Sequence, residues 1–554
     1  MKIYVFLFLS ISCTYFAKAQ SFSSVVAGMQ TVLQTVENNK NQITQTLKEK
    51  EPGVLLYTCT TTTIKDGKSQ QEVYEFNMAD IDINTIRAFT NKDVIQVQCL
   101  VAKKQKFIKK TTDSQKSNYE QEVFFYAKNI DNGRELVDAL KGLVPISENI
   151  IDKRLSLKTY QEHLNWLVAN ITQVNLLDKQ YVQKLTSSSK IPGRLEFIVD
   201  QVSSGKSVNS SFQFNLANLN PNSIFAEVKG DVIVLHVETR RKLDVIKAFA
   251  TTVQKDYVNN FDFYCESVEK SRDLQKVLKQ AVLLSEDKIE AMIPKIKSVG
   301  EGIDILNSKI KSVTINEVTF TQQLLGDCVL SFTKKEATPA KMTDNIYQLN
   351  LRDLGKNLIA YNTEGKNVVI NCKTKAGSKF IKFTENQVLK NYTNQIEFQL
   401  GEVEDAIVCR AVLERLVELC EAQEIRVSGS KKELLTQIKN SITKVTENKL
   451  TYEQQLELKD DPILQFKSTE IGEKSSKLKV YEFNINDINP VTVAFNTSST
   501  AVYVSLSTNY MEKIIKYYED GAIKNYQNTF AIQTSTIEEA RLLSEMLKRI
   551  LTMK

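Results

Sequence analysis

Histidine is almost absent from this sequence: 554 residues contain only His163 and His236. A Ser-His-Asp or Cys-His catalytic arrangement would have to use one of these two residues. A zinc site built on histidine is excluded by the same scarcity. His163 lies in the helix-like stretch YQEHLNW, and His236 occupies a polar position between two apolar residues of a strand-like stretch. We therefore predict that neither histidine is catalytic.

Motifs that mark catalysis, redox chemistry or membrane insertion are also missing. The chain has no CxxC pair and no GxSxG, P-loop or GxGxxG pattern. Beyond the N-terminal segment it has no run of about 20 apolar residues, the length that a membrane-spanning helix needs. We predict no catalytic residue, no metal, no cofactor and no membrane span.

Charge of either sign is not in excess. The 72 basic and 66 acidic residues leave a net charge of +6, which gives no support to nucleic acid as a partner. Hydrophobic residues make up 42% and charged residues 25% of the chain, as in ordinary globular proteins. A chain of 554 residues is too long for one core and should divide into several domains.

The N-terminus has the pattern of a secretory signal peptide. Lys2 precedes the apolar stretch IYVFLFLSIS, and Ala17-Lys18-Ala19 forms an A-x-A cleavage site before Gln20. We predict that residues 1–19 are removed and that the protein is exported to the periplasm or the extracellular space. The alternative is a lipoprotein anchored at Cys13, although the residues before Cys13 make a poor lipoprotein signal.

The rest of the chain is organised by a block of about 70 residues that recurs four times. The copies open at Tyr74 (YEFNMADID), Phe212 (FQFNLANLN), Tyr347 (YQLNLRDLG) and Tyr481 (YEFNINDIN), between 134 and 138 residues apart. Such self-similarity is the signature of a tandem-repeat architecture. Positions within a block are counted below from its opening aromatic residue.

Within each block the hydrophobic period changes from two to about 3.6. Positions 21 and 23, and again 49 and 51, are apolar in all four copies, as one face of a strand requires. Positions 62, 66 and 69 then form one face of a helix, for example Leu543, Leu547 and Ile550 in the last copy. The four copies align without insertions, which predicts tight turns.

Two residue types recur at matched positions in every copy: asparagine at position 3 (Asn77, Asn215, Asn350, Asn484) and tyrosine at position 45 (Tyr119, Tyr257, Tyr392, Tyr526). The tyrosines are candidates for a periodic binding surface, because tyrosine offers an apolar body and a polar tip. We favour a structural role, with each asparagine bridging a turn and each tyrosine packing at the start of the last strand.

Two further strand candidates precede each block, and a helix-like segment such as KKELLTQIKNSITKV precedes them. Helix, seven short strands and a closing helix resemble the pleckstrin-homology-like fold, a small bent barrel with a helix at one end. The signal and the repeat style also resemble secreted tandem-domain proteins of the Bacteroidota, and no functional family's signature matches these residues.

We therefore predict an α+β fold of four tandem repeats at 20–152, 153–286, 287–428 and 429–554. Each repeat would be a seven-stranded antiparallel barrel or roll with a C-terminal helix and an N-terminal linker helix. Apolar stripes on the closing and opening helices would let neighbouring repeats stack.

Seven cysteines remain after Cys13, so at least one thiol is free or forms an intermolecular bond. Cys99 and Cys372 share position 25, and Cys59 and Cys328 lie on strands before the same two blocks. Either Cys59–Cys99 or Cys328–Cys372 could form a disulfide. At most one of them fits, because the two upstream cysteines stand at different points along their strands. Buried free thiols are the favoured alternative.

The function that these patterns favour is an exported, non-enzymatic scaffold or binding protein of the cell envelope. Its partner would be another protein or a polysaccharide, and the oligomeric state is left open. One alternative is a hydrolase of envelope or extracellular polymer, with a carboxylate pair built between repeats. Another is a carrier of an apolar ligand inside the small barrels.

Overall fold

A computed structural model describes residues 21–113, 117–176, 178–230, 232–447 and 449–553. These residues form two compact units. Unit 1 comprises the chain up to Lys242 together with Ala248–Val253 and Asn259–Asp287. Unit 2 comprises Leu243–Lys247, Gln254–Val258 and the chain from Lys288 onward.

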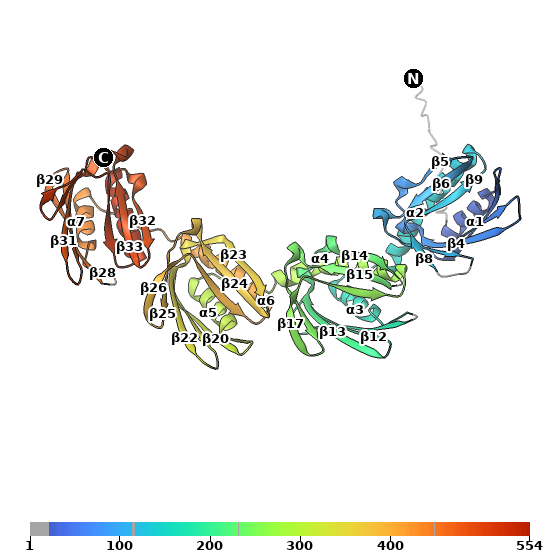
Figure 1. The fold of residues 1–554 in the computed structure, drawn as a ribbon, viewed down its shortest axis with the longest axis horizontal. Helices are drawn as coiled ribbons and strands as arrows, with labels where there is room; N and C mark the ends of the chain where they lie inside the picture. The colour runs from blue at the N-terminus through green and yellow to red at the C-terminus, as the bar shows by residue number, and fades with distance from the viewer. Residues whose placement is uncertain (1–20, 114–116, 177, 231, 448, 554) are drawn as a thin grey trace, which may run out of the picture. The chain divides into compact units, whose positions relative to one another are not determined.

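Four successive stretches of the chain have the same order of elements, and each is called a repeat below (Figure 1). Repeat 1 consists of α1 (Phe22–Val32), β1 (Val36–Glu37), β2 (Asn41–Glu51), β3 (Val54–Thr63), β4 (Ser69–Asn77), β5 (Arg87–Asn91), β6 (Val94–Leu100), β7 (Ile108–Thr112), β8 (Asn118–Glu120), β9 (Glu122–Ala127) and α2 (Ile130–Arg154). Repeat 2 consists of α3 (Tyr160–Asn170), β10 (Val174–Asn175), β11 (Lys179–Ser187), β12 (Arg194–Ser203), β13 (Lys206–Asn215), β14 (Phe225–Lys229), β15 (Val232–Glu238), β16 (Ile246–Ala250), β17 (Val253–Val258), β18 (Asn260–Cys265) and α4 (Val268–Glu290).

The second half of the chain repeats this order. Repeat 3 consists of α5 (Val299–Ile310), β19 (Ser312–Ile315), β20 (Val318–Gly326), β21 (Val329–Ala337), β22 (Met342–Asn350), β23 (Leu354–Glu364), β24 (Asn367–Thr374), β25 (Ile381–Glu385), β26 (Val388–Thr393), β27 (Gln395–Leu400) and α6 (Val403–Glu421). Repeat 4 consists of α7 (Lys431–Ser441), β28 (Val445–Glu447), β29 (Leu450–Asp460), β30 (Ile463–Ile471), β31 (Ser476–Asn484), β32 (Ala494–Ser498), β33 (Ala501–Ser507), β34 (Lys516–Glu519), β35 (Ala522–Ile523), β36 (Thr529–Thr534) and α8 (Ile537–Thr552).

The strands of each repeat form two antiparallel sheets. In repeat 3 the orders are β19-β20-β21-β22-β25-β26 and β23-β24-β27, and the other repeats follow the same plan. The prediction of an α+β fold with recurring antiparallel sheets is confirmed. The predicted seven-stranded barrel is wrong in strand number and in closure, because the described residues of each repeat form nine strands in two sheets.

A short 3₁₀ turn marks the point where the chain passes from the first sheet to the second. In repeat 3 it covers Leu351–Asp353, directly after β22, and β23 belongs to the second sheet. The Asn350 side chain accepts a hydrogen bond from the Arg352 N–H at 3.1 Å and thereby caps the turn. Equivalent turns follow β4, β13 and β31.

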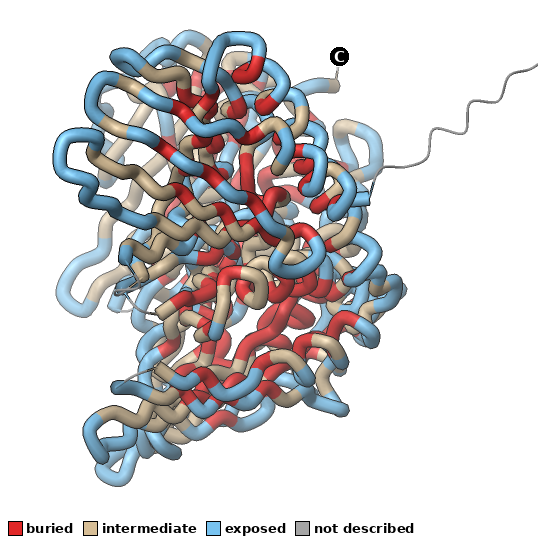
Figure 2. Tube along the Cα trace, turned by 90° about the vertical axis from the view of Figure 1, so that its right-hand side faces the viewer, coloured by how far each residue is buried: buried red, intermediate tan, exposed pale blue. Residues whose placement is uncertain are grey.

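The two helices of a repeat lie against its sheets. In unit 2, α6 packs on β23, β24 and β27, while α5 packs on α6 and β20. The closing helix of repeat 4 buries Leu543, Leu547 and Ile550, as its 3.6-residue period predicts. Exposed residues gather at the hairpin tips and buried ones in the interior of the repeats (Figure 2). None of the described helices has the length and hydropathy needed to span a membrane.

Two of the predicted repeat boundaries fall inside helices. The boundary after residue 152 lies within α2, which ends at Arg154, and the boundary after 286 lies within α4, which ends at Glu290. Both closing helices are longer than the stripe of positions 62 to 69 indicated. The boundary after 428 falls between α6 and α7. The predicted signal peptide, residues 1–19, and the alternative anchor at Cys13 lie outside the described residues.

Candidate binding groove

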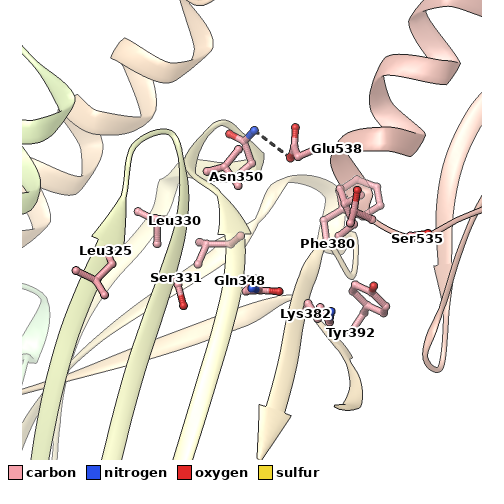
Figure 3. Close-up of a pocket in the computed structure, with 14 residues that line it drawn as sticks. Leu325, Leu330, Ser331, Gln348, Asn350, Phe380, Lys382, Tyr392, Ser535 and Glu538 are labelled. Carbon is pink, nitrogen blue, oxygen red and sulfur yellow. Dashed lines mark hydrogen bonds between the residues drawn. The ribbon is translucent and has the colours of Figure 1, made fainter. Parts of the chain in front are cut away.

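Unit 2 contains a groove of about 440 Å³ on the outer face of the repeat 3 sheet, with the first turn of α8 as one wall (Figure 3). Its lining is largely apolar and comes from β20, β21, β22, β25, β26 and the start of α8. The lining residues are Leu325, Val329, Leu330, Ser331, Gln348, Leu349, Asn350, Phe380, Lys382, Tyr392, Ser535, Thr536, Ile537 and Glu538.

One rim of the groove is the hairpin between β20 and β21. Leu325 and Val329 stand at its tip with 55% and 50% of their surfaces exposed. Gly326 has a φ of +123°, and a Cβ on it would lie 2.5 Å from the Val329 carbonyl oxygen. Only glycine fits this turn, which turns two bulky apolar side chains toward solvent.

The opposite wall is made of aromatic side chains that are already packed. Phe380 contacts Phe495 of repeat 4 with the ring centroids 4.6 Å apart. Tyr392 is 5% exposed, and its N–H donates a hydrogen bond of 3.1 Å to the Ser499 carbonyl. Burial raises the pKa of Tyr392 to about 12, so its hydroxyl stays protonated at neutral pH. This wall joins repeats 3 and 4.

Polar groups stand at one end of the groove. The Asn350 amide donates a hydrogen bond of 3.1 Å to the Glu538 carboxylate, as Figure 3 shows. Beside it, Asp353 and Arg541 form an ion pair whose side chains are 9% and 11% exposed. Burial raises the pKa of Asp353 and the Arg541 guanidinium opposes that rise. These charges hold repeat 4 against repeat 3.

The groove is mostly apolar, with a few polar groups. Its volume lies within the range of ligand pockets, and its apolar walls would gain free energy by leaving water. The Glu538 carboxylate is engaged by Asn350 and by Arg541. Glu538 is the one carboxylate among the lining residues, which include no histidine, and Lys382 and Tyr392 are the other ionisable groups there.

The four recurring asparagines each cap a 3₁₀ turn in their own repeat. Their side-chain oxygens accept from the N–H two residues on, at 2.9 Å for Asn77, 3.2 Å for Asn215, 3.1 Å for Asn350 and 2.9 Å for Asn484. They are not brought together, and only Asn350 also lines the groove.

The four recurring tyrosines lie in different surroundings. Tyr257 and Tyr392 are 6% and 5% exposed, Tyr119 is half-buried, and Tyr526 is 44% exposed. The first three stand on β17, β26 and β8, one strand before the last strand where they were expected. Only Tyr392 lines the groove, so the tyrosines form no common surface there.

Neither predicted disulfide forms. Cys328 is bonded to Cys420 with the Cα atoms 5.5 Å apart, while Cys59, Cys99 and Cys372 are buried free thiols. The correction has a simple cause: Cys420 lies on the closing helix α6, which packs across the repeat, whereas Cys372 lies inside a strand of the second sheet.

Each of the two histidines lies within hydrogen-bonding distance of an oxygen in its own repeat. His163 is buried, with Nδ1 2.8 Å from the Thr159 carbonyl oxygen, and His236 Nδ1 lies 2.8 Å from the Asp262 carboxylate. Within the described residues no three His, Cys, Asp or Glu side chains cluster in the manner of a metal site.

Carboxylates also line a shallower hollow of about 640 Å³ at the C-terminal end of α6. Glu421 is paired with Lys375, Glu424 with Arg426 and Glu545 with Lys548. Their exposed side chains do not resemble the desolvated carboxyl that a glycosidase uses as its acid.

The groove residues Leu325, Val329 and Phe380 were missed by sequence reasoning. One signal was available: Leu324 and Leu325 are adjacent, and adjacent strand residues point to opposite faces. One leucine of the pair must therefore face outward.

No protein-family model matches the chain, and no curated protein matches it.

Proposed function

We propose that this chain is an exported, non-enzymatic scaffold or binding protein of the cell envelope, built from four pleckstrin-homology-like repeats. Its binding site is the groove between repeats 3 and 4, and the ligand is a segment of a partner protein that presents a bulky apolar side chain. The observation that carries this proposal is the half-exposed pair Leu325 and Val329 beside the packed wall of Phe380 and Tyr392.

A protein partner is favoured over a polysaccharide by the state of the aromatic rings. Sugar rings are bound by aromatic faces that lie open, as CH groups stack on them. The Phe380 ring already packs on Phe495, and Tyr392 is buried. The exposed rim residues Leu325 and Val329 suit an apolar side chain better than a sugar.

The pleckstrin-homology-like assignment is supported by the order of elements in each repeat. Consecutive antiparallel hairpins lead to a terminal helix that packs on the second sheet. The interior of repeat 3 is filled: the Phe332 ring lies 4.4 Å from Phe398 and 5.8 Å from Tyr347. This filling disfavours a carrier that holds its ligand inside the sheets.

The test compares capture of envelope proteins by three forms of the full chain. The groove variant carries Leu325→Glu and Val329→Glu, both at exposed positions that tolerate charge without unfolding. The control carries Leu458→Glu, an equally exposed leucine (54%) on β29 of repeat 4. We expect the same partner with the wild type and the control, and at least tenfold less with the groove variant.

Equal capture by all three forms would contradict the groove as the site. Retention on insoluble envelope polysaccharide that the groove variant loses would replace the protein ligand by a sugar. Release of reducing ends from that polymer by the purified chain would favour the hydrolase.

A further inference from the structure

Neighbouring repeats are joined through equivalent positions. In unit 1, Asp80 at position 6 of repeat 1 accepts two hydrogen bonds of 2.5 Å from Arg272 at position 60 of repeat 2. In unit 2, Asp353 at position 6 of repeat 3 pairs with Arg541 at position 60 of repeat 4. All four side chains are at most 13% exposed. The same buried ion pair thus forms twice, in separate units.

A backbone contact also recurs at equivalent positions. Within unit 2, the N–H of Tyr257 at position 45 donates to the carbonyl of Gly365 at position 18 of repeat 3, at 3.3 Å. The N–H of Tyr392, again at position 45, donates to the carbonyl of Ser499, again at position 18 of repeat 4, at 3.1 Å. Each tyrosine ring joins the hydrophobic core of the repeat that follows it.

Position 33 supplies an apolar anchor to the same contact. Val245 is 4% exposed and belongs to the core of repeat 3, and Phe380 stacks on Phe495 of repeat 4. Position 16 adds a side-chain hydrogen bond, because the Thr497 hydroxyl donates to the Lys379 carbonyl at 2.7 Å. The joint between repeats 3 and 4 therefore combines positions 6, 33 and 45 of repeat 3 with positions 16, 18 and 60 of repeat 4.

Repeat 4 presents its own positions 6, 33 and 45 to solvent. We call Asp487, Ile514 and Tyr526 the trailing face. Ile514 and Tyr526 are 41% and 44% exposed, although their counterparts Val245 and Tyr392 are 4% and 5% exposed. Asp487 makes no ion pair with any residue that the structure describes. The trailing face has the groups of a joint without its partner.

Repeat 1 presents the complementary positions. We call Thr90, Lys92 and Arg134, at positions 16, 18 and 60, the leading face. Lys92 has a φ of +54°, close to the +61° of Gly365 and the +53° of Ser499, so its turn offers its carbonyl in the same way. Arg134 has 73% of its side chain exposed, and its one ion pair among the described residues is with Asp131 on its own helix.

We propose that the trailing face of one molecule docks on the leading face of a second copy of this chain. Asp487 pairs with Arg134, the Tyr526 N–H donates to the Lys92 carbonyl, and Ile514 and the Tyr526 ring are buried. The contact is head to tail, so it propagates into open filaments or closes into rings. This inference does not depend on the groove or its ligand.

The second copy is the occupant because the two faces carry the chemistry of the joints inside the chain. Their charges are complementary, with acid on the trailing and arginine on the leading face, as in the Asp80–Arg272 and Asp353–Arg541 joints. Joints within one chain form at an effective concentration in the millimolar range, so the contact between chains should require concentrated protein.

The test is sedimentation of the full chain from 1 µM to about 500 µM at low salt, the upper limit approaching that effective concentration. We expect the weight-average mass to rise from 63.0 kDa to at least twice that value. Asp487→Arg or Arg134→Asp alone should weaken association at least tenfold. An equimolar mixture of these two variants should restore it, because each new contact again joins opposite charges. Arg426→Asp, at an arginine 88% exposed outside both faces, is the matched control and should associate as the wild type.

Restoration in the mixture separates the proposal from a folding defect, since a misfolded variant would not be rescued by another. Far-UV circular dichroism of each variant should match the wild type because both positions are solvent-accessible. A mass of one chain at every concentration would overturn the proposal. So would a charge-reversed mixture that associates no better than either variant alone.

Discussion

Removing Arg272 should destabilise unit 1 far more than removing the equivalent arginine of repeat 1. Arg272→Met would leave the Asp80 carboxylate, 7% exposed, buried without its cation. Breaking one side of a buried pair costs about 3–5 kcal/mol. The pair lies between two repeats, which can separate and hydrate Asp80, so the lower end of that range applies.

The equivalent arginine of repeat 1 provides the control. Arg134 stands at position 60 of repeat 1, and its pair with Asp131 has side chains 73% and 85% exposed. An exposed pair of this kind contributes about 0–1 kcal/mol. Arg134→Met should therefore leave the free energy of unfolding nearly unchanged.

The assay uses the chain's only tryptophan. Trp166 lies on α3 of repeat 2, so its fluorescence in urea reports the unfolding of that repeat, to which Arg272 also belongs. With a urea m-value of about 2 kcal/mol/M, a loss of about 3 kcal/mol lowers the midpoint by about 1.5 M. For Arg134→Met the shift should be about 0.5 M or less.

A double variant separates the charge from the packing. Asp80→Leu with Arg272→Met replaces the pair by apolar groups, and such replacements are often neutral. The double variant should regain most of the midpoint lost by Arg272→Met. If the double and the single variant unfold at the same urea concentration, the loss comes from packing, and the account of the buried charge is wrong.

Three further predictions concern other residues. Cys328→Ser removes the disulfide to Cys420, which closes a loop with a sequence separation of 92, and should lower the free energy of unfolding of repeat 3 in urea by up to about 4.5 kcal/mol. The control Cys409→Ser, at a buried free thiol, should lower it by about 1 kcal/mol. Tyr392→Ala should lower the free energy of unfolding by about 3 kcal/mol and make the joint between repeats 3 and 4 sensitive to proteolysis. Tyr526→Ala should change neither the stability nor the proteolysis, because that ring is already 44% exposed. Burial raises the pKa of Cys59 to about 11, above that of an unfolded thiol near 8.5, so this thiol ionises first in the unfolded chain. Between about pH 8.5 and 11 it should by itself lower the free energy of unfolding by about 1.4 kcal/mol per pH unit. The difference in that free energy between the wild type and Cys59→Ala should therefore change over this range, and a constant difference would exclude the thiol as the cause.

The repeating part of the fold was predictable because it follows from the spacing of apolar residues along the sequence. Apolar residues two apart gave the strands, and Leu543, Leu547 and Ile550 gave the closing helix. The turn at Asn350 was also expected from asparagine's tolerance of turn geometry.

The division into two sheets was not predictable from spacing. Strands such as β1 and β10 have two residues each, too short for any period to show. The sequence of the turn after β22 does not indicate whether the next strand joins the same sheet or the second one. Hydrogen bonds between strands far apart in the sequence decide this.

The disulfide and the groove escaped prediction for a related reason. Cys328 reaches a cysteine on α6, 92 residues away, and no local pattern marks that helix as its neighbour. The groove combines Leu325 of repeat 3 with Ile537 of repeat 4, so neither repeat alone contains it. Sequence periodicity describes single elements, whereas these sites depend on packing between elements.

The Asp–Arg joint is better understood as a device for choosing neighbours than as a source of stability. A buried pair roughly offsets its own desolvation, but a wrong neighbour leaves one charge buried alone and costs several kcal/mol. Repeat 2 has Asn218 at position 6, so docking it on Arg541 would strand that arginine. Repeat 3 has Ile407 at position 60, so docking it on Asp80 would strand that carboxylate. By the same rule, the charged trailing face of repeat 4 accepts a face with arginine at position 60. Arg134 offers such a face, because its pair with Asp131 is exposed and lies within its own helix.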